Sequence, residues 1–283
     1  MQAAFFIRQL RYRFQALEKV SFGAAGAAND IRGALGMALL RRNDSAYSAL
    51  FEPRQTGLGP SGFANQPRPF VIRASHLDDT KIDSGETFQF DIHLFEIGEM
   101  ASRAVEAIGS AFGQMAREGL GPRRGWAALT AVEQKDISID LGASPDRLTH
   151  IKVEFVTPTE LKSGSELAAE PEFPGLFARV RDRVSTLRTL YGGGAVTVDF
   201  LALAESARGV IMESCQVRRV DRVRQSSRTG QSFRLGGFVG EAIYSGHLAE
   251  FWPWLQAGEW TGVGRQTVWG KGQIRVTPLE DLS

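Results

Sequence analysis

Residues 216–276 decide the fold. They read QVRRVDRVRQSSRTGQSFRLGGFVGEAIYSGH (216–247), LAEFWPWLQAG (248–258) and EWTGVGRQTVWGKGQIRV (259–276). The first stretch alternates like a β-hairpin, the second is a short apolar helix, and the third is strand-like but interrupted by glycines. Two strands, a helix and a strand form the last four elements of a β-α-β-β-α-β unit, which is the ferredoxin-like order.

The residues before this stretch complete the unit. Ile151, Val153 and Phe155 alternate as a strand that ends at Thr157-Pro158, and residues 176–191 have helical spacing up to three consecutive glycines. A further helical piece, AVTVDFLALAESA (195–207), is an addition to the pattern.

The first half of the chain follows the same order. The patterns predict strands at 4–17, 70–77 and 87–95, helices from Asn29 or Asp30 to Arg42 and over 99–117, and closing strands at 126–134 and 136–141. The sequence therefore predicts an α+β fold of tandem ferredoxin-like (RRM-like) domains, at 1–143 and 144–283, each with an antiparallel sheet. Two such sheets side by side would leave a cleft suited to single-stranded or hairpin nucleic acid.

Composition narrows the class of protein. The chain has 283 residues and a formal net charge of only +1, so any basic surface must be local. Its single cysteine, Cys215, excludes a disulfide framework or a cysteine-rich zinc site and fits a reducing cytoplasm. No apolar run reaches membrane-spanning length. We expect a cytoplasmic protein with no membrane partner.

Basic residues and glycines are concentrated in the last third of the chain. Guanidinium groups on extended backbone, beside glycines that admit a polyanion to the main chain, suit a phosphate-rich ligand. The alternative is a solvated basic face with loop glycines, and Trp252, Trp254 and Trp260 are better explained as core or interface anchors than as base-stacking platforms. The predicted RNA-binding residues are Arg218, Arg222, Arg224, Arg228, Gly262, Gly264, Arg265, Gly270, Lys271 and Gly272.

Two mutational expectations follow from that assignment. Replacing Arg224 and Arg228 by alanine should weaken RNA binding and flatten its salt dependence. Gly264→Val should impair RNA binding much more than it lowers the melting temperature, because a Cβ would block the approach of the RNA to the main chain.

Several segments resemble a known family. The tandem order, VEFVTPTELKSG (153–164), RQSSR (224–228) before LGGFVGE (235–241), and GVGRQTVWGKG (262–272) resemble the CRISPR-associated repeat-RNA processing endoribonucleases. These are the sixth Cas family, within the RAMP superfamily. DIRGALGMALLRR (30–42), LFEP (50–53) and PRPFVIR (67–73) look like that family's first domain.

The resemblance implies an activity. Such proteins bind the repeat of a CRISPR precursor transcript and cut it once per repeat, by attack of a 2′-OH that leaves a 2′,3′-cyclic phosphate, with no metal or other cofactor. The partners would be CRISPR repeat RNA, the guide RNA product and other CRISPR effector subunits. The alternative is a non-catalytic RAMP subunit that binds the guide-RNA handle within an effector complex. An RNA-binding protein of an unrelated process is a third option.

Histidine suits the proton transfers because its pKa lies near neutrality. Many relatives place a catalytic histidine in or just after the first helix, but residues 29–55 contain none here. Of the four histidines, His93 and His150 alternate with core residues, and we expect a surface position or inter-sheet packing for each rather than catalysis. His247, at the start of a helix that would keep its ring neutral, and His76, close to acidic residues, are the candidate catalytic residues. Tyr47, Arg32 and Lys81 come next, and no residues stand at metal-ligand spacing.

Overall fold

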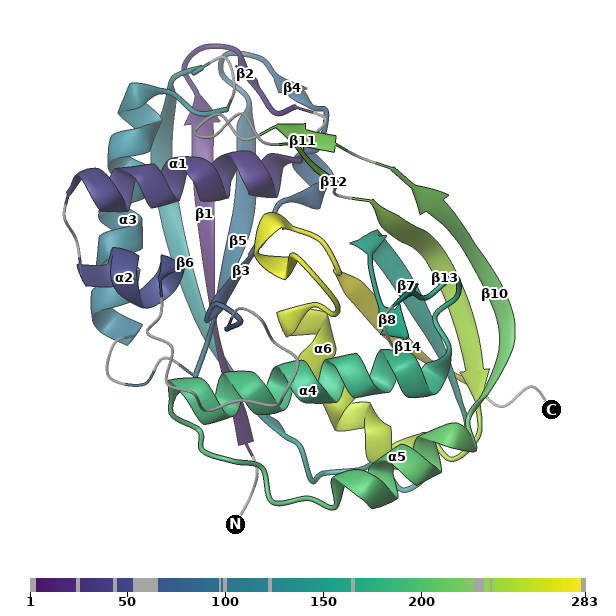
Figure 1. The fold of residues 1–283 in the computed structure, drawn as a ribbon. Helices are drawn as coiled ribbons and strands as arrows, with labels where there is room; N and C mark the ends of the chain where they lie inside the picture. Colours follow the sequence, from purple (N-terminus) through teal and green to yellow (C-terminus); the bar gives the residue numbers. More distant parts are fainter. Residues whose placement is uncertain are drawn as a thin grey trace.

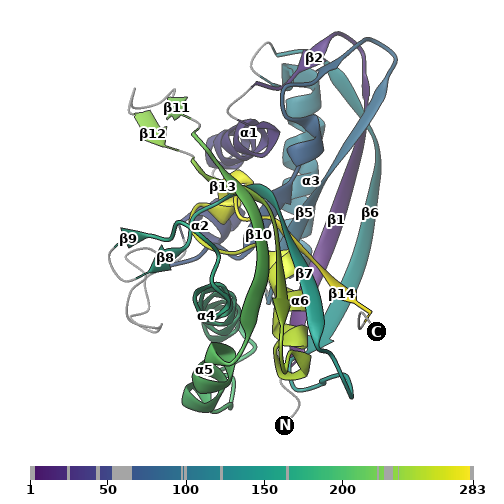
Figure 2. The same cartoon turned by 90° about the vertical axis from the view of Figure 1, so that its right-hand side faces the viewer.

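The computed structural model describes residues 4–23, 26–42, 45–52, 66–96, 98, 101–121, 124–163, 166–221, 223–225, 232–234 and 236–280. Two four-stranded antiparallel sheets lie side by side, each with helices packed on one face (Figures 1 and 2). No helix in these ranges combines the length and the apolarity needed to cross a membrane.

The first sheet has the strand order β3-β5-β1-β6. Its strands are β1 (Ala4–Ala16), β3 (Phe70–Arg73), β5 (Thr87–Phe95) and β6 (Ala127–Asp140), with α1 (Ala27–Arg41), α2 (Ser45–Phe51) and α3 (Ala101–Glu118) as helices. A short pair, β2 (Val20–Ser21) with β4 (Lys81–Ile82), and the 3-10 turn η1 (Ser75–Leu77) connect them. The two closing strands expected from the sequence are one continuous strand, β6.

The second sheet repeats this topology in the order β10-β13-β7-β14. Its strands are β7 (His150–Thr159), β10 (Ile211–Val220), β13 (Gly237–Ser245) and β14 (Ile274–Leu279), with α4 (Phe173–Tyr191), α5 (Phe200–Arg208) and α6 (Trp252–Thr261) as helices. Two small hairpins are added: β8 (Lys162–Ser163) with β9 (Glu166–Leu167), and β11 (Val223–Gln225) with β12 (Ser232–Arg234). The 3-10 turns η3 (Ala249–Phe251) and η4 (Thr267–Trp269) flank α6. The tandem ferredoxin-like prediction is confirmed.

Alternation along β1 explains how the two halves pack together. Leu10, Tyr12 and Phe14 point into the core beneath α1 and α3, as expected for one face of a strand. Phe5 and Ile7, on the opposite face, belong to the core of the second half, so the two halves share one apolar interface. Trp254 is buried in that second core and Trp252 and Trp260 pack against it, which confirms their interpretation as anchors.

Element ends differ from expectation in two instructive places. The helix α1 begins at Ala27, two residues early, because the carboxylate of Asp78 accepts a hydrogen bond from the Ala27 amide at 2.9 Å, a capping contact made from another element. The last strand begins only at Ile274, because Gly270 and Gly272 adopt positive φ. β6 ends at Asp140 and β7 begins at His150; the domain boundary at 143/144 stays a prediction.

Candidate nucleic-acid interface

Residues 262–273, which we name the glycine-rich loop, lie between the two halves of the molecule. They follow α6, contain η4, and lie between α1 and α4 in the view of Figure 1. A Cβ added at Gly270 would stand 2.5 Å from the Cβ of Ala28 in α1. The Ser75 hydroxyl of η1 donates to Gln273 Oε1 at 3.2 Å. The loop is therefore packed against the first domain on one side.

The glycines of this loop are required by the protein's own backbone. Gly264 and Gly272 have φ of +79° and +69°. A Cβ would collide with the carbonyl oxygen of Glu160 at the first and that of Val263 at the second. Val263 N also donates to Gly272 O at 2.8 Å, which closes the loop on itself. The expectation that Gly264→Val would spare folding is therefore wrong, whereas RNA contact by Gly262, Gly264, Gly270 and Gly272 stays a prediction.

Lys271, expected at a phosphate, is buried with only 4% of its surface exposed. Its ammonium donates to Gly236 O and to Gln266 Oε1 at 3.0 Å, and lies 3.6 Å from Glu160 Oε1. Burial lowers the pKa of Lys271, and the carboxylate of Glu160 opposes that shift. Because Gly236 stands between β12 and β13, Lys271 ties the glycine-rich loop to the base of the small hairpin of β11 and β12, which we name the basic hairpin.

Arg265 remains on the surface, with Nη1 3.8 Å from Glu160 Oε2. Both loop cations therefore share Glu160, a carboxylate distant in the sequence, which the expectation of few carboxylates near them did not include. A pair at that distance and exposure is weak, so the Arg265 guanidinium is accessible to a phosphate.

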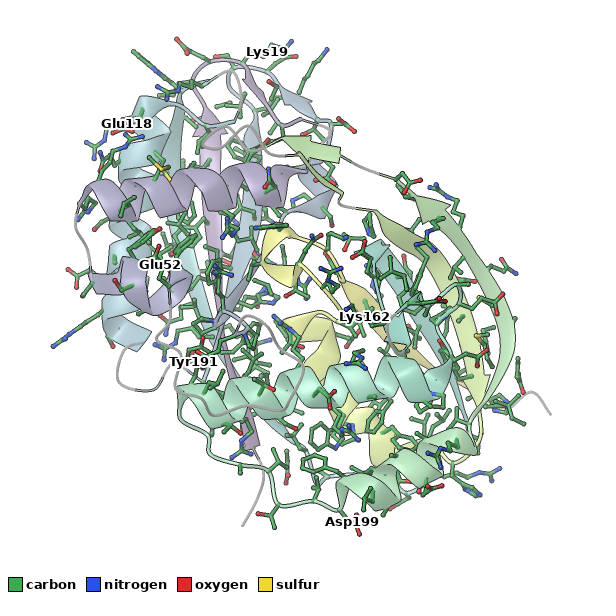
Figure 3. The ribbon with its side chains drawn as sticks, viewed as in Figure 1. Lys19, Glu52, Glu118, Lys162, Tyr191 and Asp199 are labelled. Carbon is green, nitrogen blue, oxygen red and sulfur yellow. The ribbon has the colours of Figure 1, made fainter. Side chains whose placement is uncertain are left out.

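The basic stretch forms a long, two-part hairpin. β10 and β13 pair in the second sheet, and β11 and β12 extend them toward the N-terminal end of α1 (Figure 1). Arg224 pairs with Phe233 in this extension, but its side chain, like Arg222 and Arg228, lies outside the described residues. Beside the glycine-rich loop, β8 carries exposed Lys162 (Figure 3).

Arg218 and Arg219 are both exposed but point to opposite faces of β10. Arg218 lies opposite Val239, whereas Arg219 lies opposite Phe238, on the face that α4 covers. The sequence assignment chose Arg218 and omitted Arg219. Strand alternation predicts that the two arginines point to opposite faces, but Val217 lies on the face of Arg219 and Val220 on that of Arg218, so the local pattern does not show which face the helices cover.

Cations paired with carboxylates lie on the face of each sheet opposite its own helices; on the first sheet, the second half of the molecule covers part of that face. Arg11 binds Asp91 at 2.8 Å and Arg13 contacts Glu133 at 3.1 Å on the first sheet; Arg275 binds Glu154 at 2.7 Å on the second. Each pair cancels most of the field that would attract RNA. The loop and hairpin side of the molecule is thus the better candidate for a polyanion.

The two candidate histidines lie far apart. His76 is exposed in η1, next to the Ser75 that contacts the glycine-rich loop, with Nε2 2.8 Å from Gln89 O. His247 is exposed after β13, where Gly246 N bonds Thr149 O, at the opposite end of β13 from the basic hairpin. Nine residues of strand separate these ends by roughly 27 Å. The fold brings His76, but not His247, to the loop.

The other histidines have structural surroundings. His93 is buried against Trp260, and His150 lies 3.6 Å from Glu213. Among the described residues, no group of three or more histidine, cysteine or acidic side chains is placed to hold a metal ion.

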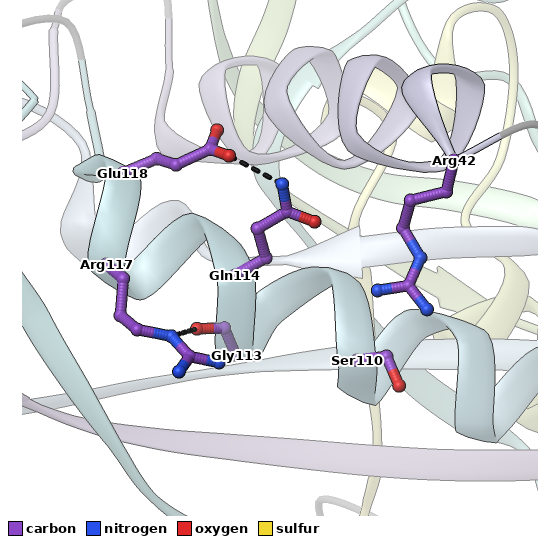
Figure 4. Close-up of a pocket in the computed structure, with 6 residues that line it drawn as sticks. All are labelled: Arg42, Ser110, Gly113, Gln114, Arg117 and Glu118. Atoms are coloured by element: carbon purple, nitrogen blue, oxygen red, sulfur yellow. Dashed lines mark hydrogen bonds between the residues drawn. The ribbon is translucent and has the colours of Figure 1, made fainter.

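A pocket lies elsewhere, at the C-terminal end of α1. Arg42 lines it together with residues of α3, where Arg117 donates to Gly113 O and Gln114 to Glu118 (Figure 4). It is at the opposite end of α1 from η1, so it is separate from the loop and hairpin.

Comparison with known proteins first defines the class. An 'RAMP protein binding different RNA substrates' has this fold, with a TM-score of 0.51 at 12% identity over 95% of this chain and 99% of that one. Cas6 of Thermus thermophilus has a TM-score of 0.62 at 16% identity over 96% and 99% of the two chains. A Cas6 product complex has 0.63 at 16% identity over the same shares. The chain is a RAMP-fold protein.

Two family models each match one half of the chain. Residues 153–274 match the model of the CRISPR-associated endoribonuclease Cas6, and residues 5–145 match a model described as an N-terminal domain. No curated protein sequence matches the chain. The resemblance found in the sequence is confirmed: the second half of the chain matches the Cas6 endoribonuclease model, and the chain as a whole has the Cas6/RAMP fold.

Proposed function

We propose that the protein binds CRISPR repeat RNA and cleaves the precursor transcript into guide RNAs without a metal ion. The position of the glycine-rich loop carries the proposal, because it places Arg265, η1 and the basic hairpin on one side of the molecule. Relatives of this fold include Cas6 in product and substrate-mimic complexes, and a Cas6-RT-Cas1–Cas2 complex. We extend RNA and CRISPR protein partners to this chain on that basis. The cytoplasmic location remains a prediction.

Metal-free cleavage uses the 2′-OH beside the scissile phosphate. Its oxygen forms a bond to phosphorus, its proton passes to a base, and the 5′-oxygen leaves with a proton from an acid, which yields a 2′,3′-cyclic phosphate and a 5′-OH. His76 is the better candidate base of the two. A neutral ring that donates from Nε2 to Gln89 O has Nδ1 as its basic nitrogen. In this proposal, the exposed guanidinium of Arg265 offsets the charge that develops on the phosphorane.

The decisive experiment is incubation of the protein with the repeat RNA of its own locus in EDTA. We expect a single cut, with a cyclic phosphate on the upstream fragment and a 5′-OH on the downstream one. A 5′-phosphate product, or a strict requirement for added Mg²⁺, would contradict the mechanism. Tight binding of the repeat with no cut would establish the non-catalytic RAMP subunit instead.

The two arginines of β10 give a matched test of where the RNA lies. Arg219→Ala should weaken repeat binding and reduce the salt slope by about one unit at most, because Arg219 shares the face of α4 and the loop. Arg218→Ala removes the same charge from the other face and should cost less. Affinity measured across a salt series checks this. A larger loss for Arg218 would place the RNA on the uncovered face of the sheet.

A further inference from the structure

Side chains from three elements converge on the C-terminal end of α6. Arg73, the last residue of β3, donates from Nη2 to the carbonyls of Glu259 and Trp260 at 2.7 and 2.8 Å. Arg183 of α4 donates from Nε to Thr261 O at 3.0 Å. His93 of β5 approaches Trp260 O with Nδ1 at 3.3 Å. We name Arg73, His93 and Arg183 the α6 clamp.

The unpaired carbonyls at the end of α6 explain why these basic side chains gather there. The last carbonyls of a helix have no partner within it and carry partial negative charge, so they attract cations. The clamp satisfies three consecutive carbonyls, with residues of the first domain on one side and α4 on the other.

Burying two guanidinium groups in the interface costs desolvation free energy. Arg73 and Arg183 are 8% and 6% exposed, and in the described part of the chain neither forms an ion pair. Burial, followed by the nearby Arg183, lowers the pKa of Arg73 to about 9, and burial lowers that of Arg183 to about 10, so both are charged at neutral pH. The carboxylate of Glu259 is engaged by Val276 N at 2.6 Å. Apolar side chains would fill such space at no greater cost, whereas the guanidiniums fix a direction.

The clamp fixes the orientation of the C-terminal end of α6, and this end sets the direction in which the glycine-rich loop leaves the helix. Thr261 is the last residue of α6, and the first residue of the loop, Gly262, donates from its amide to Gly258 O at 2.8 Å. Val263 then pairs with Gly272, whose amide donates to Pro158 O at 3.1 Å. A rotation of the α6 end would therefore move the whole loop relative to η1 and α1.

We propose that Arg73 and Arg183 are positioning residues, which hold the glycine-rich loop against the first domain in the orientation that binds RNA. This inference rests on the proposed function, since it takes repeat RNA as the ligand. It makes the domain interface itself a determinant of RNA affinity, although neither arginine is exposed to RNA.

The test uses Arg73→Met and Arg183→Met, with Arg275→Met as a control that removes an exposed arginine from the uncovered face. Amide hydrogen exchange of the RNA-free protein should speed up roughly tenfold or more at Val263 and Gly272, the loss expected for a charge-assisted hydrogen bond, and much less in β7. Repeat RNA affinity, measured where each variant is fully folded, should fall roughly tenfold. Arg275→Met should change neither.

Each other outcome has one meaning. In one outcome, amide hydrogen exchange rises uniformly through β7 and the loop while the RNA affinity of the folded protein is unchanged. That result would overturn the proposal, because the clamp would then only stabilise the fold. If Arg73→Met does not fold, Arg73→Lys, which keeps the charge and one bond, should show an intermediate change at Val263 and Gly272; wild-type exchange there would overturn the proposal. A wild-type protein that binds no repeat RNA would refute the proposed function, and the exchange data would still decide whether the clamp orients the loop.

Discussion

Gly272→Val should destabilise the fold by about 4 kcal/mol or more, a large part of the roughly 5–15 kcal/mol that holds a typical domain together. Gly272 has φ of +69°, a conformation that a β-branched residue rarely adopts. A side chain there would also collide with the carbonyl of Val263, whose amide bonds Gly272 O. Thermal unfolding should show a loss of about 10 °C or more, if the variant folds at all.

Gly85→Val is the matched control for this prediction. Gly85 also has positive φ, at +92°, but a Cβ there meets nothing within 4 Å. The Gly85→Val variant has the strain of a positive φ but no collision with a neighbouring atom. Its melting temperature should therefore be well above that of Gly272→Val. Similar melting temperatures for the two variants would show that the loop relaxes to admit a side chain at Gly272, and would contradict this prediction.

The glycines of this loop show where sequence reasoning reaches its limit. A glycine that admits a phosphate and a glycine that admits a neighbouring carbonyl look the same in a sequence. The partner of Gly264 is the carbonyl of Glu160, whose side chain also binds Lys271 and Arg265. Such contacts depend on how β7 and the loop meet in space, which no local pattern encodes.

The architecture was predictable because it depends on periodicity. Alternation in β1 and β5 and helical spacing in α3 extend over whole elements, and the repeated order then fixes the topology. Arg73 shows the contrast: after the apolar run FVI it resembles an exposed strand end, yet it is buried against α6 of the other domain. The histidines differ for the same reason, since only the fold shows which of them lies near the loop.

Replacing the 2′-OH immediately upstream of the scissile phosphate by hydrogen should abolish cutting of the repeat RNA while leaving binding nearly intact. The substitution removes the proposed nucleophile and little else. His76→Ala should lower the single-turnover rate by about two to four decades with RNA affinity retained, because Nδ1 of His76 is the proposed acceptor of the 2′-OH proton. Both effects are measured in EDTA, with enzyme in excess over labelled repeat RNA.

His247→Ala is the internal control, since His247 is exposed in the same way but lies at the far end of β13. It should cut at close to the wild-type rate. A large loss for His247→Ala with none for His76→Ala would mean that the RNA crosses the end of the second sheet, away from the glycine-rich loop. If both variants cut normally, Tyr47, Arg32 and Lys81 become the next candidates for proton transfer. Cutting of the 2′-deoxy substrate would exclude attack by the 2′-OH altogether.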